Sequence, residues 1–237
     1  LGEHPNYEYL LTTPPAIAGD LAIVGSAVTD NMSTTVPGGV VRAYDLNTGE
    51  LAWFWDPIPP ATQPELTEEG QLYQRATTNV WSIMSFDPEL NLVYLPTGNT
   101  SPDYFGGLRD GSDYYSSSVV ALHASTGEVA WHFQTVHHDI WDYDVPSQPT
   151  LYDVTMNGKV VKALAQTTKM GYIFLLDRET GEPLFPVEER PVPQGAVPGD
   201  YTSPTQPFPT KPPTLLDPTF NPEDVWGLTP WDKNACR

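Results

Sequence analysis

The chain has 237 residues, enough for one or two ordinary domains, and its apolar content of 39% excludes an intrinsically disordered protein. Thirty acidic residues against eleven basic residues give a net charge of -19, which argues against nucleic acid and anionic membrane surfaces as direct partners. The single cysteine, Cys236, excludes an internal disulfide framework and a Cys-based metal site. No apolar run approaches the roughly 18 residues that a membrane helix needs.

Short strands joined by turns are predicted from the first apolar runs onward. Two such runs flank Gly19-Asp20 and predict a β-hairpin. Residues 40–45 form the next predicted strand, and residues 51–55 form the strand that returns. Between them, Asn47-Thr48-Gly49 supplies a turn in which Gly tolerates a left-handed backbone. Long helical periodicities are absent, so the sequence predicts an all-β fold.

This strand–turn–strand unit recurs. The stretch VVRAYDLNTGELAWFW begins at Val40, VVALHASTGEVAWHFQ begins at Val119, and a weaker copy, IFLLDRETGEPLF, begins at Ile173. The first two copies place Trp53 and Trp131 four residues after the turn Gly. Repeated four-stranded units with insertions predict a β-propeller. A large Trp ring at a fixed place in each unit is suited to fill the space between adjacent blades.

The whole chain, residues 1–237, is therefore predicted to be part of one β-propeller domain. Blade repeats are expected near residues 14–55, 78–134 and 147–186. The Pro-rich segment 187–237 is expected to be an extended excursion that lies on another part of the protein. Two further stretches without a strand pattern, residues 56–75 and 103–115, are predicted to be surface loops.

A polar cluster, His137-His138-Asp139-Ile140-Trp141-Asp142-Tyr143-Asp144, interrupts this pattern. Three carboxylates and two imidazoles beside large aromatic side chains are unfavourable both in a core and on a surface, so the cluster predicts a functional loop. The alternative is a loop whose His and Asp side chains only satisfy one another. Adjacent His side chains in a strand point to opposite faces, so His137 and His138 are expected to be packing residues rather than joint metal ligands.

The repeat Ala-x-Asp-x-x-Thr-Gly-x-x-x-Trp resembles the blade motif of the pyrroloquinoline quinone (PQQ) dehydrogenases. The segment from Trp81 through Phe86-Asp87 and Asn91 to Gly98 is similar to the signature of bacterial quinoprotein dehydrogenases, with Phe86 where Tyr is usual. The stretches VTDNMSTT, TVHHDIWDYDVPSQPTL and PVPQGAVPGDYTSPTQPF most resemble the membrane-bound glucose dehydrogenase branch. The resemblance implies an eight-bladed propeller, of which about three to four blades are present in this chain.

The resemblance also implies roles for single residues. Asp142, in Trp-Asp-x-Asp, matches the general base of this branch, and Lys169 matches the Lys that contacts the quinone oxygens. Trp81 matches the floor under the cofactor ring, and Asn79 falls where the family places a polar cofactor contact. The chemistry suits these residue types, because a carboxylate can remove a hydroxyl proton while hydride leaves, and Lys offers a compact cation for the quinone oxygens.

Two residues are implied as ligands of a divalent metal ion. Asp30 matches the acidic ligand in Val-Thr-Asp-Asn, and Asn99 matches the Asn that ligates calcium in the methanol and alcohol branch. The glucose branch has an apolar residue at the position of Asn99, so both the metal (Ca²⁺ or Mg²⁺) and the substrate stay open. Oxygen ligands suit either ion. Each residue also has an ordinary structural alternative: Lys169 as a solvated turn lysine, Trp81 as core, and Asp30 as a turn residue.

The function implied is that of a periplasmic dehydrogenase that oxidises an aldose or cyclic polyol, with glucose to gluconolactone favoured, by hydride transfer to PQQ. Electrons would pass to ubiquinone, and the parent protein would be anchored in the inner membrane and supply the remaining propeller blades. One alternative is the oxidation of quinate, shikimate or another alcohol. An alternative of another class is a non-catalytic propeller that serves as a scaffold.

Overall fold

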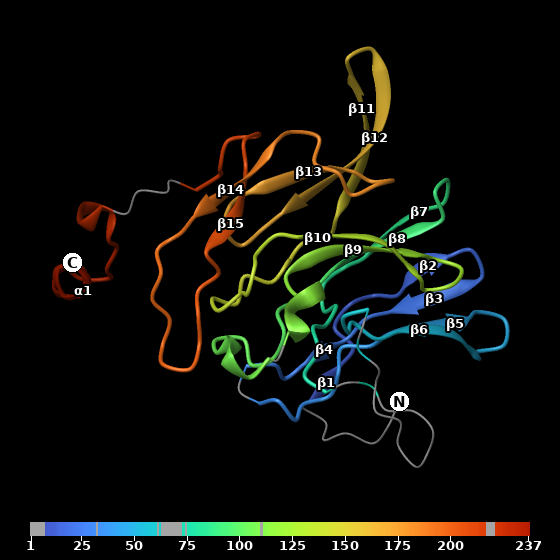
Figure 1. The fold of residues 1–237 in the computed structure, drawn as a ribbon, viewed down its shortest axis with the longest axis horizontal. Helices are drawn as coiled ribbons and strands as arrows, with labels where there is room; N and C mark the ends of the chain where they lie inside the picture. Colours follow the sequence, from blue (N-terminus) through green and yellow to red (C-terminus); the bar gives the residue numbers. More distant parts are fainter. Residues whose placement is uncertain are drawn as a thin grey trace.

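Three antiparallel sheets follow one another along the chain and lie side by side in the computed structural model (Figure 1). The structure describes residues 8–31, 33–60, 62, 73, 75–109, 111–216 and 221–237. The first sheet contains β2 (Ala16–Ala18), β3 (Leu21–Val24), β5 (Val41–Asp45) and β6 (Leu51–Trp55). The second contains β7 (Ser85–Asp87), β8 (Leu92–Pro96), β9 (Ser118–His123) and β10 (Val129–Gln134). The third contains β11 (Thr150–Met156), β12 (Lys159–Thr167) and β13 (Ile173–Asp177).

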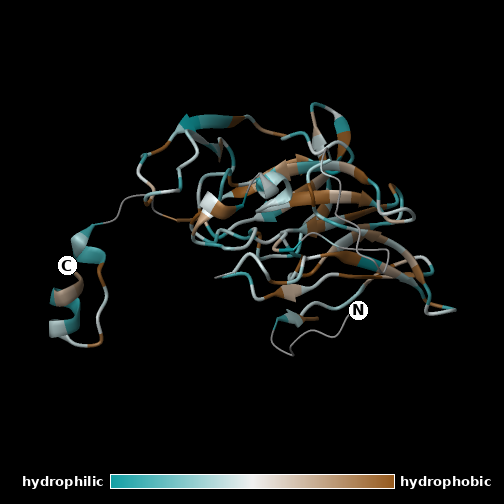
Figure 2. Cartoon of the chain, turned by 60° about the horizontal axis from the view of Figure 1, so that its bottom comes forward, coloured by the Kyte–Doolittle hydropathy of each residue, from teal (hydrophilic) through white to brown (hydrophobic). Residues whose placement is uncertain are grey.

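The middle sheet is buried on both faces. All five residues of β8 are buried, which explains why its sequence, LVYLP, is continuously apolar instead of alternating. One core cluster joins the first and second sheets and includes Trp53, Val93 and Leu122. A second cluster joins the second and third sheets and includes Tyr94 and Phe174. Figure 2 shows the corresponding hydrophobic colouring along the stacked strands.

The repeated Trp connects each sheet to the next one. The Trp53 indole nitrogen donates to the carbonyl of Ala124 at 2.9 Å, and Trp131 donates to the carbonyl of Arg178 at 3.2 Å. Each ring covers a turn Gly: a Cβ on Gly127 would lie 2.5 Å from the Trp53 ring, and a Cβ on Gly181 would lie 2.6 Å from the Trp131 ring. Both glycines also have positive φ. Gly is therefore required here by backbone conformation and by packing.

Sheets of sequential antiparallel strands, packed face to face through a repeated Trp, are blades of a β-propeller. The predicted fold class is thus confirmed, with three blades in this chain. The hairpin predicted around Gly19-Asp20 is also present as β2 and β3. The third sheet has three strands, and an isolated bridge between Leu176 and Pro183 extends its pattern. The total of eight blades stays a prediction.

Shorter elements surround the three sheets. They are the paired strands β1 (Tyr9–Leu10) and β4 (Ala27–Val28), the paired strands β14 (Val187–Pro191) and β15 (Thr205–Pro209), the 3₁₀ helices η1 (Gly106–Leu108), η2 (Ser112–Tyr115) and η3 (Pro222–Asp224), and helix α1 (Pro230–Cys236). No helix in the described part of the chain has the length and apolar character required to cross a bilayer.

Two loop predictions need correction. Residues 103–115 were predicted to form a surface loop, but Asp103, Arg109 and Tyr115 are 2%, 3% and 4% exposed. Tyr104 and Leu108 do remain exposed, each at 57%, so the segment is a surface segment fixed by buried residues. Arg109 fixes it, because its guanidinium donates to the main-chain carbonyls of Pro102, Asp103 and Asp139. Segment 187–237 is not simply extended, since it contains the β14–β15 hairpin and α1. The predicted loop 56–75 lies largely outside the described residues.

The path of the chain places the long connections at one end of the sheets. Successive antiparallel strands reverse direction, so the connections β3–β5, β8–β9 and β12–β13 share an end with the links β6–β7 and β10–β11. We call this the loop end. The tight turns that contain Gly49, Gly127 and Gly181 lie at the opposite end, which we call the turn end. All six residues singled out as site candidates fall in loop-end connections: Asp30, Asn79, Trp81, Asn99, Asp142 and Lys169.

Candidate active site

Hydrogen bonds join the loop-end connections to one another. Gly98 N donates to the Asn79 carbonyl at 2.7 Å, and Val145 N donates to the Thr97 carbonyl at 3.1 Å. Asp103 N donates to the Asp30 carbonyl at 3.3 Å. These contacts bring the β3–β5, β6–β7, β8–β9 and β10–β11 connections into one assembly. Residues as distant in the sequence as Asn31 and Asp103, 72 positions apart, therefore meet here because of the sheet topology.

Lys169, Asp142 and Asp144 form the charged centre of the site. The Lys169 ammonium donates to the Asp142 carbonyl oxygen at 2.7 Å, to Asp142 Oδ1 at 3.1 Å and to Asp144 Oδ2 at 3.0 Å. The pKa of Lys169 is raised: burial alone would lower it, but the charges and hydrogen bonds of the two carboxylates outweigh that effect. Lys169 is therefore held as a cation and is not a solvated turn lysine.

The two aspartates differ in their surroundings. The Asp144 side chain is 10% exposed, and both of its oxygens are engaged, one by Lys169 and one by the main-chain N of Asn99. Burial raises the pKa of Asp144 to about 7, with Lys169 opposing the shift and Asp142 adding to it. The Asp142 side chain is 26% exposed, and its Oδ2 accepts only a long 3.3 Å hydrogen bond from the Tyr104 hydroxyl among the described residues. Asp142 is thus the more accessible proton acceptor.

Asp139 shapes the backbone that presents Asp142. Its Oδ1 accepts from Trp141 N at 2.9 Å, and its Oδ2 accepts from Tyr143 N at 2.7 Å and from the Ser117 hydroxyl at 2.7 Å. Between the two anchored amides, Asp142 adopts a φ of 60°, in the left-handed region that non-Gly residues avoid. Such a conformation persists only where the surroundings impose it, and the buried Asp139 carboxylate does so.

A second group of polar side chains surrounds Asp30. Asn79 Nδ2 donates to Asp30 Oδ2 at 2.8 Å, and Asn31 Nδ2 donates to Asp103 Oδ2 at 2.8 Å. Burial raises the pKa of Asp30. Burial, together with the negative charges of Asp30, Asp144 and Asp142, raises the pKa of Asp103 to about 8. The raised pKa values show that nearby positive charge does not compensate the burial of the Asp30 and Asp103 carboxyl groups.

Asn99 is occupied by contacts within the protein. Its Oδ1 accepts from Thr100 N and from the Ser116 hydroxyl, each at 2.8 Å. Its Nδ2 donates to the carbonyls of Asp103 at 3.0 Å and Asp139 at 2.9 Å. Metal ligation by Asn99, which the sequence implied together with Asp30, would require the bonds to its carbonyl oxygen to be broken.

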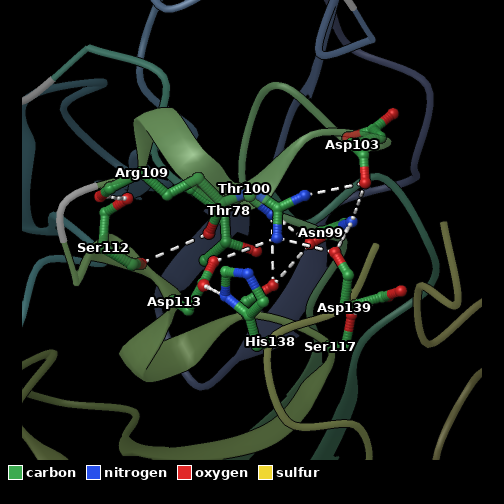
Figure 3. A network of polar contacts seen from close by, with 12 residues as sticks. Thr78, Asn99, Thr100, Asp103, Arg109, Ser112, Asp113, Ser117, His138 and Asp139 are labelled. Carbon is green, nitrogen blue, oxygen red and sulfur yellow. Dashed lines mark hydrogen bonds and ion pairs between the residues drawn. The ribbon is translucent and has the colours of Figure 1, made fainter. Parts of the chain in front are cut away.

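A buried Arg completes the support of this region. Figure 3 shows Arg109 reaching between Asn99, Asp103 and Asp139. Its guanidinium donates to the carbonyls of Asp103 at 2.7 Å and Asp139 at 2.6 Å, and it pairs with Asp113 at 3.2 Å. Asn99 and Arg109 thus bond the same two carbonyls, so together they fix the main chain next to Asp103 and next to the loop that carries Asp142.

The two histidines diverge, as expected. His137 faces Gln134 at 2.7 Å and Glu189 at 3.0 Å. His138 is buried, and its two ring nitrogens lie 2.7 Å from Asp113 Oδ2 and 2.8 Å from Asp200 Oδ1. Burial lowers the pKa of His138, but the two carboxylates raise it more, and the net shift is upward. We call the contacts of His138 with Asp113 and Asp200 the His138 clamp. Because Asp200 lies between β14 and β15, the clamp holds that part of the chain against the loop end.

A cavity of about 580 Å³ opens beside the charged centre. Lys169 lies in its wall, and most of the lining is apolar or aromatic, including Trp141, Tyr172 and Phe208. Its size is in the range of small-molecule sites. Trp81 is not among its lining residues. Trp81 is half-buried, and the hydroxyl of its neighbour Ser82 donates to the Pro146 carbonyl at 2.8 Å. The role of Trp81 as a floor under the cofactor ring stays a prediction.

The donor set fits a hard divalent cation better than a soft one. In the described ranges, no three His, Cys, Asp or Glu side chains form a ready-made metal cage. The oxygens of Asn79 and Asp103 that make no hydrogen bond are instead amide and carboxylate donors, the types that Ca²⁺ and Mg²⁺ prefer. The cation Lys169, beside an aromatic cavity, likewise fits an anionic aromatic cofactor such as PQQ.

Sequence reasoning missed Asp103, Tyr104, Arg109 and Asp139 as contributors to this site. Asp103 and Arg109 belong to a Gly/Asp/Tyr-rich segment, whose composition is typical of exposed turns. One signal was available in the sequence: an Arg and several acidic residues follow shortly after Asn99. Such residues can be expected to form ion pairs if the segment folds inward. Asp139 lies within the polar cluster 137–144, but nothing in the sequence distinguishes its carboxylate from its neighbours.

Comparisons with known proteins identify the family to which the chain belongs. The family model "Glucose/ethanol/alcohol dehydrogenase, beta-propeller domain" matches residues 1–237. The chain is 43% identical to the quinate/shikimate dehydrogenase (quinone) of Acinetobacter baylyi, with 100% of this chain and 30% of the relative covered. It is 44% identical to the quinoprotein glucose dehydrogenase of Escherichia coli, with 97% and 29% covered. It is also 44% identical to the glycerol dehydrogenase large subunit of Gluconobacter oxydans, with 100% and 32% covered.

A solved structure is similar as well. The quinohemoprotein alcohol dehydrogenase of Pseudomonas putida superposes with a TM-score of 0.64 at 29% identity, over 81% of this chain and 30% of that chain. The chain therefore spans about a third of the length of the proteins that it matches.

Proposed function

Because the chain belongs to the β-propeller family of PQQ-dependent dehydrogenases, we propose that its loop end forms part of the active site of an enzyme that oxidises a polyhydroxylated alcohol or sugar. The observation that carries this proposal is Lys169, an ammonium held between Asp142 and Asp144 in the wall of a cavity. A cation, an accessible carboxylate and an aromatic pocket are the groups that such a reaction requires.

Asp142 is the proposed general base. It has an accessible carboxylate oxygen, and its backbone is held in one conformation by Asp139. A substrate hydroxyl that approaches this oxygen loses its proton to Asp142 as the carbon–hydrogen bond is broken. When bound, PQQ supplies a quinone carbonyl carbon that accepts the hydride, and a divalent cation makes that carbon more electrophilic.

Lys169 has two roles in this proposal. It neutralises part of the charge of Asp142 and Asp144, and it directs an ammonium toward the place where anionic oxygens of a cofactor would lie. Tyr104 supports the same carboxylate from the other side, at 3.3 Å. Asn79 and Trp81 are kept as proposed cofactor contacts, and Asp30 as a proposed metal ligand.

A non-catalytic scaffold explains these features less well. Buried carboxylates that lack enough positive charge destabilise a fold, and a scaffold gains nothing from them. Asp103 and Asp144 both have a pKa raised by burial, to about 8 and about 7. Titratable groups perturbed in this way and gathered in one region are typical of functional sites.

For the substrate, glucose and quinate are the two candidates, with support of similar strength. The matches to a glucose dehydrogenase and to a quinate/shikimate dehydrogenase have nearly equal identity. A periplasmic location, a membrane anchor, the remaining blades and electron transfer to ubiquinone are further proposals that rest on family resemblance.

The test is a dye-linked assay of the full-length protein after reconstitution with PQQ and either Ca²⁺ or Mg²⁺. Glucose, quinate and glycerol are compared, with the Asp142→Asn variant as the matched control. We expect dye reduction with glucose or quinate in the parent protein, and its loss in the variant. Tight PQQ binding without oxidation of any of the three would contradict the proposed substrate class.

A further inference from the structure

The buried side-chain oxygens at the loop end that have no hydrogen-bond partner among the described residues include Asn79 Oδ1 and Asp103 Oδ1. Asn79 is fully buried and Asp103 is 2% exposed. A buried polar atom that is left unpaired costs about 1–3 kcal/mol. A ligand that pairs with these oxygens would remove that cost.

The two side chains that carry these oxygens are both hydrogen-bonded to the segment Asp30-Asn31: Asn79 to Asp30 Oδ2, and Asp103 Oδ2 to the Asn31 amide. Asn79 donates its amide NH₂ to Asp30 Oδ2 at 2.8 Å. Asp103 is tied to Asp30 through the main chain, because Asp103 N and the Ser101 hydroxyl both donate to the Asp30 carbonyl, at 3.3 and 2.6 Å. Asp144 closes the other side: a Cβ built on Gly98 would lie 3.1 Å from Asp144 Oδ1 and 3.3 Å from both amide atoms of Asn79.

The charge around these oxygens is unbalanced. Four carboxylates influence one another here: Asp30, Asp103, Asp142 and Asp144. Lys169 is the one cationic side chain that is hydrogen-bonded to any of them within the described ranges, and it bonds only Asp142 and Asp144. Figure 3 shows that Asp103 meets Arg109 through its main-chain carbonyl, while its carboxylate lies on the other side of the residue. Among the described residues, the carboxylates of Asp30 and Asp103 therefore have no hydrogen-bonded cation, and Lys169 and Arg109 act on them only from a distance.

We propose that Asp103 is a ligand of a divalent cation, which it holds together with Asp30 and the side-chain oxygen of Asn79, while Asn99 is a scaffold residue and not a ligand. The donors are all hard oxygens, so the cation is Ca²⁺ or Mg²⁺. Asn99 positions Asp103 instead, by donating to its carbonyl while its own oxygen is used by Thr100 and Ser116.

The competing explanation is that Asp103 is a neutral carboxylic acid whose second oxygen is merely buried. The two explanations differ in what a change to Asn does. Asn has nearly the shape of a protonated Asp but carries no charge, so it imitates the neutral acid and, as a ligand, offers only a neutral oxygen in place of an anionic one. Asp103→Asn therefore separates the two cases without a large change in volume.

The experiment is a calorimetric titration of the chelator-treated full-length protein with Ca²⁺ and then with Mg²⁺, without PQQ and with saturating PQQ. The comparison is made with or without PQQ, whichever gives the parent protein the higher metal affinity. There, Asp103→Asn should weaken metal binding at least about tenfold, since even the loss of residues that only support the ligands costs about 10–100-fold in metal affinity. Asp153→Asn, the same charge change at an exposed strand position, should leave the affinity unchanged. Equal affinity of Asp103→Asn and the parent, or absence of metal binding by the parent, would overturn the inference.

Asn79→Asp covers the case in which Asp103→Asn does not fold. This variant places a carboxylate where the unpaired amide oxygen is, next to Asp30. Without metal it should melt at a lower temperature than the parent, because it adds a buried charge, and saturating Ca²⁺ should stabilise it more than it stabilises the parent. An equal or smaller stabilisation would show that the Asn79 oxygen does not face the cation.

This inference deepens the proposed function, since the cation would act in the same site, yet it can fail separately. A protein that binds Ca²⁺ through Asp103 but oxidises no alcohol would contradict the proposed function alone. A protein that oxidises glucose or quinate, with metal affinity indifferent to Asp103, would contradict the inference alone.

Discussion

The turn end and the loop end of the three sheets follow opposite rules. At the turn end, short Gly-containing turns repeat, and each described Trp-over-Gly contact is made in the same way, by Trp53 on Gly127 and by Trp131 on Gly181. At the loop end, the connections differ in length and sequence, and several buried charged side chains lie there, whereas the turn end has the buried ion pair Asp87–Arg178. The repeat thus builds a frame, and the irregular connections use that frame to bring distant polar residues together. Stability and chemistry are therefore separable by mutation.

The largest effect on stability should come from the turn end. Trp131→Ala removes a ring that fills the space between the second and third sheets and a hydrogen bond to the Arg178 carbonyl. We expect the free energy of unfolding to fall by about 3–5 kcal/mol. Trp226→Ala, at a position 78% exposed, should change it by less than about 0.5 kcal/mol. Denaturant titration of both variants of the full-length protein measures the difference, and similar losses would mean that the ring does not join the sheets.

Asn99→Val tests whether a loop-end residue is structural. The variant leaves the carbonyls of Asp103 and Asp139 with fewer donors, and it removes the acceptor used by Thr100 and Ser116. We expect a loss of roughly 2–4 kcal/mol in unfolding free energy, because several buried groups lose partners. The exposed Asn47→Val serves as control. A stable Asn99→Val protein with weakened calcium binding would instead show that Asn99 is a ligand.

The smallest effect should be a pH dependence at the His138 clamp. Because the pKa of His138 is raised in the folded protein, its contribution to stability is complete below the unfolded value of about 6.5 and is lost as the pH rises through the folded value. His138→Gln should therefore be less stable than the parent by about 1–2 kcal/mol at pH 6, with the gap narrowing in more alkaline buffer. Melting curves of both proteins between pH 6 and pH 9 give the gap. A gap that widens with pH would mean that His138 is held in its neutral form.

Sequence reasoning predicted the frame well because the frame is encoded locally. The Thr-Gly turn, the flanking apolar strands and the fixed Trp lie within 16 residues of one another, so the repeat is visible without knowledge of the fold. The β14–β15 hairpin was not visible, since Pro191, Pro207 and Pro209 hide its strand pattern. Pro is tolerated there because each strand of a two-stranded pair has a free edge.

The site was only partly predictable for a related reason. Asp142 and Lys169 lie in recognisable motifs, and the structure brings them within 3.1 Å of each other. The environment of Asp103 depends on carbonyls and carboxylates from four connections, and no local pattern encodes that arrangement. For the same reason, the sequence could not show that the side-chain oxygen of Asn99 is already used by Thr100 and Ser116.

The central claim is that the loop end uses Asp142, and not Asp144, as the general base. The direct measurement is single-turnover reduction of bound PQQ in the full-length Asp142→Asn and Asp144→Asn variants, with cofactor and metal saturating. Asp142→Asn should slow reduction by about 10²–10⁴-fold, because the amide cannot accept the proton. Asp144→Asn should mainly affect folding or cofactor affinity, because both oxygens of Asp144 hold Lys169 and the Asn99 backbone. Near-parent reduction in Asp142→Asn, together with an inactive Asp144→Asn, would contradict the assignment.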